Sequence, residues 1–474
     1  MVGVPRSRGC ALCVKRRVKC DERIPECAKC EKYGKPCPGY NRGFKFITGK
    51  PYRSRRRLPG NGNDTTDIQS PESVSPSIIS SDRRSASQEL IQRHTQLFFV
   101  SADLNVLQSL SALVDDFSNP TPALSQKFVV SQWFGLLPDI YGQSKILDAA
   151  IKSFVTHHLG KLYRDERMLV YARSTYGEAL HRLRKSLANP SEYLSSHVFC
   201  AVVMLCLYEL FTNRENPESW IKHAQGLGQL VRVRGPGRYR NKLDISLLKV
   251  SRGLIVMHSM FSGEPCFLAS NEWHQTMKHQ YVTDMPADYH DIIESFFAYF
   301  TYAPSLVHKL FSLREIDPTT PEAFQVASDA LSQALDMRSK LDSWYDQWCK
   351  IAPLPVEELS TDDALYPVIL TYAGLTDAQI YCGYYSYMVI IHETLKNLGY
   401  IGPHADMVVY YRDQICKSIE FSSKGALGPY RVGFSLRVAI EVADPVTKSW
   451  IINRLEKFSK IYAAAQPENY QPVL

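Results

Sequence analysis

Hydrophobic and polar positions in the C-terminal part of the chain repeat mostly with the period of an α-helix, and alternating strand patterns are sparse. Residues 196–211 form a nearly continuous apolar run, which predicts a buried helix. Residues 220–233 carry an apolar stripe, and the Arg-Gly-Pro-Gly sequence that begins at Arg234 predicts where this helix ends. Residues 368–398 form another long apolar and aromatic stretch with helical spacing. The pattern predicts a large all-α domain over residues 89–474 in a mainly α protein.

Two shorter regions precede this domain and lack its hydrophobic pattern. Residues 8–40 contain few large apolar side chains but six of the twelve cysteines, which predicts a small domain with two short helices that folds around metal. Residues 41–88 are first basic and then rich in Gly, Asn, Ser, Asp and Pro, which predicts a flexible, disordered linker. Residues 87–100 offer at most about two heptads, so a dimerising coiled coil and a first domain helix both fit.

Charge is distributed unevenly along the chain. Residues 1–60 hold 17 Lys and Arg against 4 Asp and Glu, a net charge of +13. Because the formal charge of the whole chain is +7, the remaining residues carry −6. A basic head on a slightly acidic body indicates that the head, and not the body, binds a polyanion. The basic start of the linker fits both phosphate contacts and a nuclear import signal.

The six N-terminal cysteines form an internal repeat. Two, six, six, two and six residues separate them, and the second three follow the first three 17 positions on: Cys10, Cys13, Cys20, Cys27, Cys30 and Cys37. Three thiolates per half are too few for a closed structural zinc site, which has four ligands. Six cysteines suffice for two Zn²⁺ if two of them bridge both ions. The symmetry of the repeat indicates Cys10 and Cys27 as the bridging ligands.

Two other chemistries compete with zinc. A disulfide-bonded knot needs an oxidising compartment, and the N-terminus shows no apolar segment of a secretory signal. Copper(I) also binds thiolates well, although the two-half layout with an interposed basic segment favours zinc. The other six cysteines lie in apolar stretches without ligand spacing, and we expect them to be buried core thiols: Cys200, Cys206, Cys266, Cys349, Cys382 and Cys416.

The segment between the second and third cysteines is strongly basic. Val14 and Val18, four positions apart, can face the metal cluster while the cations point outward. A short helix held rigidly by the cluster can enter a major groove, where Arg or Lys bonds guanine O6 and N7 and other cations bind phosphates. We therefore expect binding of double-stranded DNA by four of its six residues: Lys15, Arg16, Arg17 and Lys19.

Residues 9–46 resemble the fungal binuclear zinc-cluster transcription factors, the six-cysteine class. The resemblance covers all six cysteines and the basic run between the second and third of them. It extends over Lys19-Cys20-Asp21, Pro25 between the halves, and the continuation Pro38-Gly39-Tyr40 with Arg42 and Lys45-Phe46. The sequence departs from the family pattern at Val14, where a cation is frequent.

The resemblance implies a role for each of these residues. It implies that Cys10 and Cys27 bridge both Zn²⁺ ions. Cys13 and Cys20 would complete one site, and Cys30 and Cys37 would complete the other. Base contacts would come from Arg16 and Arg17, and phosphate contacts from Lys15 and Lys19. The DNA target would contain CGG-like triplets.

Residues 220–236 resemble, more diffusely, a stretch of the regulatory domain of the same family. The resemblance implies a nuclear, sequence-specific RNA polymerase II transcription regulator. Its helical domain would regulate activity and recruit the transcription machinery or co-regulators. We expect Trp220 and His223 in this stretch to be core and capping residues, because a helical stripe is most often packing.

Catalytic motifs are not found in the sequence, which lacks a phosphate-binding loop, a dinucleotide fingerprint and a nucleophile elbow. His157 and His158 diverge on a helix, and we expect them at the surface. We expect a regulator and no enzyme; an enzyme or ligand receptor with an appended zinc module is the competing hypothesis. No apolar run reaches the ~20 residues of a membrane span, so no membrane partner is expected. A homodimer and a monomer both fit the sequence.

Overall fold

The computed structural model divides the chain into two compact units, Met1–Ser80 and Ser81–Leu474. The predicted linker 41–88 and the coiled-coil candidate 87–100 lie outside the residues that the structure describes, and the predicted domain boundaries stay predictions. The structure describes residues 11–21, 27–34, 37, 106, 108–111, 113, 129–212, 219–278, 286–360 and 363–470.

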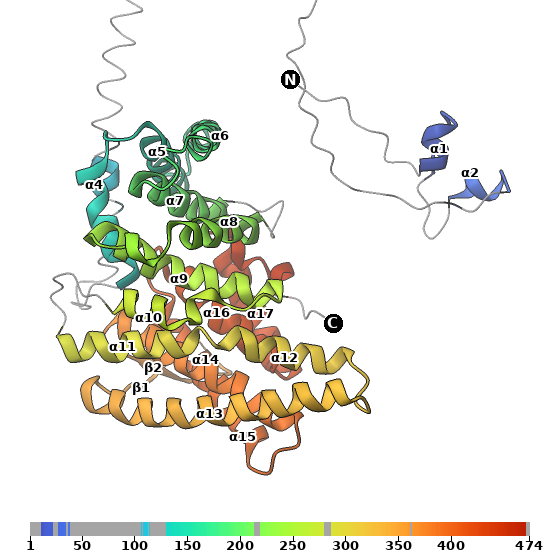
Figure 1. Ribbon diagram of the computed structural model, residues 1–474, viewed down its shortest axis with the longest axis vertical. Helices are drawn as coiled ribbons and strands as arrows, with labels where there is room; N and C mark the ends of the chain where they lie inside the picture. The colour runs from blue at the N-terminus through green and yellow to red at the C-terminus, as the bar shows by residue number, and fades with distance from the viewer. Residues whose placement is uncertain are drawn as a thin grey trace, which may run out of the picture. The chain divides into compact units, whose positions relative to one another are not determined.

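The N-terminal unit contains two short helices, α1 (Ala11–Lys15) and α2 (Ala28–Glu31) (Figure 1). Each is little more than one turn, and helices of this length are not stable alone in water. Three cysteines, Cys13, Cys27 and Cys30, are completely buried between them and form the small core of this unit. The prediction of two short helices around a cysteine cluster is confirmed.

The large unit is mainly helical, as the hydrophobic pattern predicts. Its first helices are α4 (Leu137–Ile140), α5 (Lys145–Leu162), α6 (Glu166–Leu187), α7 (Ser196–Thr212), α8 (Ser219–Arg234) and α9 (Lys242–Ser262). They are followed by α10 (Asn271–Met277), α11 (Ala287–Phe300), α12 (Ala303–Glu315), α13 (Pro321–Ile351), α14 (Leu375–Asn397), α15 (His404–Ser422), α16 (Gly428–Glu441) and α17 (Pro445–Ser459). Short 3-10 turns are η1 (Val129–Leu136), η2 (Pro236–Arg238), η3 (Phe267–Ala269), η4 (Ala463–Ala465) and η5 (Pro467–Tyr470).

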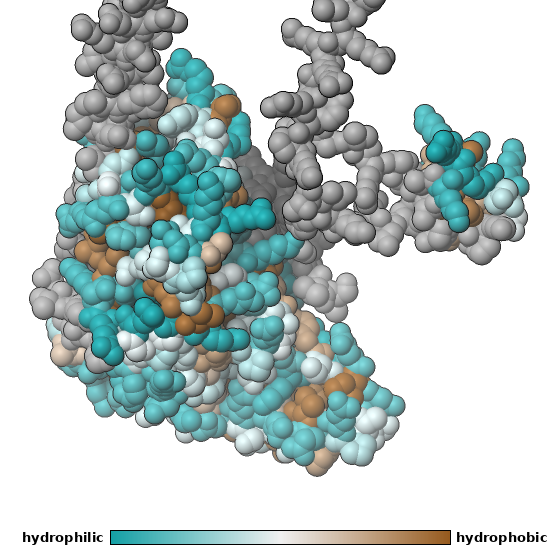
Figure 2. All heavy atoms as spheres, turned by 45° about the horizontal axis from the view of Figure 1, so that its top comes forward, coloured by the Kyte–Doolittle hydropathy of each residue, from teal (hydrophilic) through white to brown (hydrophobic). Residues whose placement is uncertain are grey.

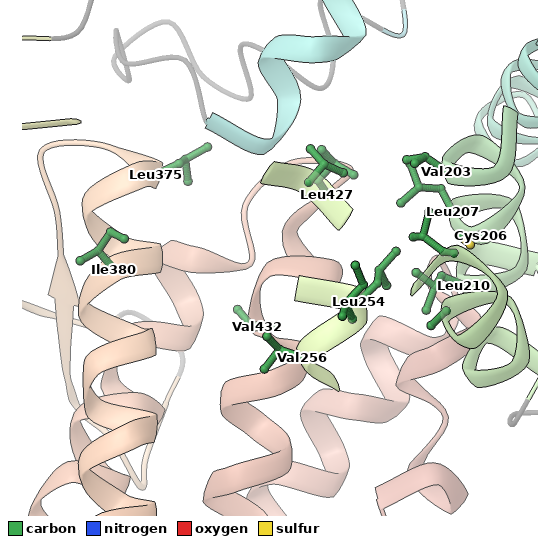
Figure 3. Packing of buried hydrophobic residues seen from close by; sticks show 14 of the residues in the cluster. Val203, Cys206, Leu207, Leu210, Leu254, Val256, Leu375, Ile380, Leu427 and Val432 are labelled. Atoms are coloured by element: carbon green, nitrogen blue, oxygen red, sulfur yellow. The ribbon is translucent and has the colours of Figure 1, made fainter. Parts of the chain in front are cut away.

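The helices of the large unit pack in two groups (Figure 1). Helices α5 to α8 pack on one another, and α11 to α15 form the second group. Helix α9 joins them, because it contacts α7 and α8 as well as α12. Its Leu254 and Leu210 of α7 belong to one hydrophobic core, which continues through both groups (Figure 3). The face of this unit seen in Figure 2 is mostly hydrophilic, with apolar residues in separate patches.

Two helices in the interior are buried on nearly all sides. Every residue of α7 from Val198 to Phe211 is buried, and so is most of α14. Each buried large apolar side chain contributes about 1.5–3 kcal/mol, so these two helices supply much of the driving force for folding of the unit. Although α7 is strongly apolar, none of the described helices has both the length and the apolar character needed to cross a bilayer.

A buried ion pair holds the end of α8 against its neighbours. Helix α8 ends at Arg234, and Gly235 follows with φ 71°, a left-handed conformation that favours glycine. The predicted end of this helix is confirmed. The Arg234 guanidinium lies 2.8 Å from the carboxylate of Asp244 in α9 and also donates to the carbonyl of Leu194. Ser196, the first residue of α7, donates to the other oxygen of Asp244 at 3.0 Å. Three helices therefore meet at one charge pair.

The prediction of a helix over residues 368–398 is wrong at its beginning. Val368–Thr371 is a strand, β2, which pairs antiparallel with β1 (Val356–Leu359) in the register Val356↔Thr371 and Leu359↔Val368. Helix α14 begins only at Leu375, after Gly374. A short apolar run does not distinguish a strand from the start of a helix, and the β-branched residues of β2 favour the strand.

The prediction that both histidines of α5 lie at the surface is wrong for His157. Its ring is buried and lies edge-on to Tyr208 of α7, with 5.6 Å between ring centroids, because α5 packs on two helices. His223 does not cap a helix, because it lies within α8 and its Nε2 is 3.4 Å from the Tyr176 hydroxyl of α6. Trp220 is half-buried and packs on Phe261, as expected of a packing residue. Five of the six C-terminal cysteines are buried, and Cys349 is half-buried.

Candidate metal centre and nucleic-acid interface

The cysteine sulfurs of the N-terminal unit gather in two groups that share one member. Cys13, Cys20 and Cys27 form one group, and Cys27, Cys30 and Cys37 form the other; within each group the sulfurs lie within 4.8 Å of one another. Cys27 is therefore the sulfur common to both. Cys10, the sixth predicted ligand, lies outside the described residues.

Local backbone structure places these sulfurs. Cys27 is the N-cap residue of α2, with extended backbone angles, and its Sγ accepts the backbone N–H of Cys30 at 3.3 Å. The helical turn that follows brings Cys30 back to the side of Cys27. Asp21, just after the first half of the repeat, accepts the N–H of Ala28 at 3.1 Å. This bond attaches the first half of the repeat to the helix of the second.

The donor set fits a thiolate-bound zinc site. The Sγ atoms of Cys13 and Cys27 lie 3.6 Å apart, close to the ~3.8 Å edge of a tetrahedron with Zn–S bonds of about 2.3 Å. That separation is far longer than the ~2.05 Å of a disulfide bond. Burial raises the pKa of the Cys27 thiol above its ordinary value, so a bound cation is needed to hold this sulfur as a thiolate.

The four predicted DNA-binding residues lie at the end of α1 and in the segment after it. Helix α1 ends at Lys15, and Arg17 has φ 55°, a left-handed conformation that turns the chain. The side chains of Lys15, Arg17 and Lys19 are exposed. Because the helix ends so early, Val18 is also 38% exposed, and the expectation that it faces the cluster is wrong.

Arg16 differs from the other three cations, because it contacts the second half of the repeat. Its guanidinium carbon lies 3.5 Å from the centroid of the Tyr33 ring. Its Nη1 also donates to the carbonyl of Lys29 at 3.4 Å. No sequence pattern indicates this contact, because the two residues are 17 positions apart and only the folded cluster brings them together.

The chain combines a cluster of buried thiols beside exposed cations with a large helical domain. Residues 8–45 match the fungal Zn(2)-Cys(6) binuclear cluster domain, and residues 130–403 match the fungal specific transcription factor domain. The second match covers more than half of the chain. The protein therefore belongs to the fungal specific transcription factor family and is a zinc-binding, DNA-binding transcription factor. Such factors are typically nuclear, and both matched domains are transcription factor domains and not enzyme domains.

Two relatives share parts of the sequence. An uncharacterized protein of Emericella nidulans is 29% identical over 171 residues, which are 35% of this chain and 36% of the relative. White-opaque regulator 2 of Candida albicans is 47% identical over 49 residues, 10% of each chain. The chain thus matches only about a third and a tenth of these two proteins. No solved structure matches the chain.

Proposed function

We propose that six cysteines bind two Zn²⁺ ions, with Cys27 and Cys10 bridging both. The observation that carries this proposal is the position of the Cys27 sulfur in both sulfur groups. Cys13 and Cys20 would complete one tetrahedral site, and Cys30 and Cys37 the other. Metal binding supplies most of the folding free energy of such a small domain, on the order of 10 kcal/mol or more.

The bound cluster would present the basic segment to the major groove of a CGG-like triplet. Arg17 is exposed on a backbone turn held by neighbouring cysteines, so it can form bidentate bonds to guanine. Arg16 keeps free donors beside its contact with Tyr33, since a guanidinium has five N–H groups. Lys15 and Lys19 would bind phosphates on either side. The excess of +13 in residues 1–60 adds sequence-independent attraction.

The helical domain would serve regulation and the recruitment of co-regulators or the transcription machinery in the nucleus. Its membership in the fungal transcription factor family supports this assignment, and the named relative from Candida albicans is called a regulator. A homodimer would place two clusters on two triplets, and the spacing of those triplets would report its geometry.

Selection of binding sites from random duplex DNA by the full-length protein tests the proposal. We expect enrichment of a CGG-like triplet that disappears when a zinc chelator is added. A second triplet at constant spacing would demonstrate a dimer. Metal analysis of protein purified without added metal distinguishes zinc from copper(I). A zinc-loaded protein that enriches no sequence would contradict base reading by the cluster.

A further inference from the structure

A cavity of about 450 Å³ lies in the large unit, and all of its lining residues belong to this unit. Its wall comes from α7, α8, α9, α11, α14 and α16 and from the C-terminal turns η4 and η5. Its size falls within the usual range of small-molecule sites. Part of the wall, from α16 and residues 462–470, lies beyond residue 403, where the family match ends. The cavity wall therefore combines helices of the matched region with C-terminal elements that lie beyond it.

Most of the cavity wall is aromatic or aliphatic. Phe300 of α11 packs edge-on against Phe434 of α16, with 5.1 Å between ring centroids, and both line the space. Leu210 and Leu254 line it from α7 and α9, and Ile380 from α14 (Figure 3). A wall of this composition favours an apolar body with a flat or branched shape.

Two buried polar atoms at the wall have no hydrogen-bond partner. Thr376, in the first turn of α14, is only 2% exposed, and its Oγ1 is unpartnered. The Oδ1 of Asn469 in η5 is also buried and unpartnered, although its amide nitrogen donates to the carbonyl of Ala464 at 3.2 Å. An unsatisfied polar atom in an interior is unfavourable, and a hydrogen bond from a bound molecule would relieve that cost. Thr376 and Asn469 both belong to the lining residues, so the wall includes polar side chains beside its apolar ones.

Two cations at the wall share one buried carboxylate. Lys249 Nζ lies 3.1 Å from Glu294 Oε1, and Arg252 Nη1 lies 2.6 Å from Glu294 Oε2. All three side chains are largely or fully buried, and Lys249 and Arg252 line the cavity. Lys249 also contacts His290 Nε2 at 2.8 Å, and burial together with the nearby Lys249 charge lowers the pKa of His290.

The opposite wall adds no excess of negative charge. Arg437 of α16 is paired with Glu441 at 2.6 Å, and Arg431 of α16 donates to the carbonyls of Ser422 and Lys424. Glu468, the one carboxylate among the lining residues, is exposed. The buried polar end of the cavity at α9 therefore carries one positive charge more than its carboxylate neutralises, and a buried anion is stabilised by such a charge.

We propose that this cavity binds a small amphipathic organic anion. Its apolar body lies among the aromatic side chains, and its single acidic group lies near Lys249 and Arg252 and hydrogen-bonds Thr376. Gly253, which lines the cavity between these elements, is exposed although Arg252 and Leu254 on either side of it are buried. A Cβ added at Gly253 meets no atom within 4 Å, so a side chain can start there and would extend into ligand space.

The test uses two probes with the same aromatic body, anilinonaphthalene sulfonate and its neutral parent phenylnaphthylamine, titrated into the full-length zinc-loaded protein. We expect one saturable site for the sulfonate, at least about tenfold tighter than the neutral probe. Gly253→Leu should abolish binding of both. Gly177→Leu, at an exposed and equally open glycine of α6, should leave binding unchanged.

Circular dichroism would reveal whether Gly253→Leu folds. If it does not, a variant that changes only the charge of the site tests the same binding. Lys249→Gln removes the excess positive charge and should weaken the sulfonate about tenfold without changing the neutral probe. Lys185→Gln, at an exposed position of α6, should change neither. Equal affinities for the two probes would overturn the anionic assignment. Absence of saturable binding, or binding that survives Gly253→Leu, would overturn the site.

Discussion

The Arg16 guanidinium stacks on the ring of Tyr33, 3.5 Å from its centroid, and so links the two halves of the cysteine repeat. At an exposed site this contact contributes about 0.5–1 kcal/mol. Tyr33→Ala should weaken specific DNA binding about two- to fivefold, because Arg16 loses its fixed position, with zinc content unchanged. Tyr33→Phe keeps the ring and should bind like the native protein. Fluorescence anisotropy with labelled duplex measures both, and equal affinities of the two variants would show that the stack does not orient Arg16.

Arg17 is expected to contact bases and Lys19 is expected to contact phosphates. Arg17→Ala should reduce discrimination between the selected site and random DNA by about 1–3 kcal/mol, since a bidentate base contact is lost. Lys19→Ala should weaken all sequences alike and lower the salt dependence by about one phosphate contact. Both follow from titrations at several salt concentrations. Equal losses on specific and random DNA for both variants would refute this division of roles.

Removal of the shared sulfur should have a larger effect than removal of a sulfur in one group. Cys27→Ser is expected to lose both zinc ions and unfold the N-terminal unit, whereas Cys30→Ser should damage one site first. Cys349→Ser, at a half-buried thiol in α13, is the control and should keep the native zinc content. The number of zinc ions per chain, measured by inductively coupled plasma mass spectrometry, distinguishes these outcomes. Identical zinc loss in the Cys27 and Cys30 variants would argue against a bridging Cys27.

The buried pair Arg234–Asp244 should be costly to break from one side. Arg234→Met leaves the Asp244 carboxylate buried without its cation, which costs about 3–5 kcal/mol in unfolding free energy. Asp244→Leu combined with Arg234→Met should cost less than the sum of the single changes. Arg182→Ala breaks an exposed pair with Glu178 and should cost under about 0.5 kcal/mol. Urea denaturation measures the unfolding free energy of the two single variants, the double variant and the Arg182→Ala control. A loss below about 1 kcal/mol for Arg234→Met would contradict a structural role for the pair.

Stability should fall in mild acid because of His392 in α14. Its Nδ1 lies 2.9 Å from Nδ1 of His404, and burial, His404 and Arg338 lower the pKa of His392 to about 4. In the unfolded chain the histidine pKa is about 6.5, so between pH 6.5 and pH 4 the unfolded chain binds more protons than the folded chain. The contribution of His392 to stability is therefore complete above pH ~6.5 and declines toward pH 4. The loss is on the order of 2 kcal/mol.

Replacement of His392 should make the stability of the protein depend less on pH. His392→Gln should remove most of the decline in denaturation midpoint between mild acid and neutral pH. His181→Gln, at an exposed position of α6, should retain it. Parallel profiles of the two variants would mean that other groups cause the acid sensitivity.

Much of the fold follows from local sequence patterns. The apolar run at 196–211 and the stripe at 220–233 became α7 and α8 with ends within about two residues of those predicted, because burial and capping signals are local. The same reasoning missed strand β2 and the burial of His157. Those outcomes depend on β1 and on Tyr208, which lie elsewhere in the chain.

The class of protein follows from local features of the sequence: six cysteines at regular spacing, a basic segment between them and a long run of helical periodicity. Such features can be recognised in one dimension, since ligand count and hydrophobic period depend on neighbouring positions. The folded structure was needed to find that Cys27 is the sulfur common to both groups and that Arg16 stacks on Tyr33. It also decided that Lys249 and Arg252 face a cavity with a single carboxylate between them. These relationships join residues far apart in the chain, and packing alone brings them together.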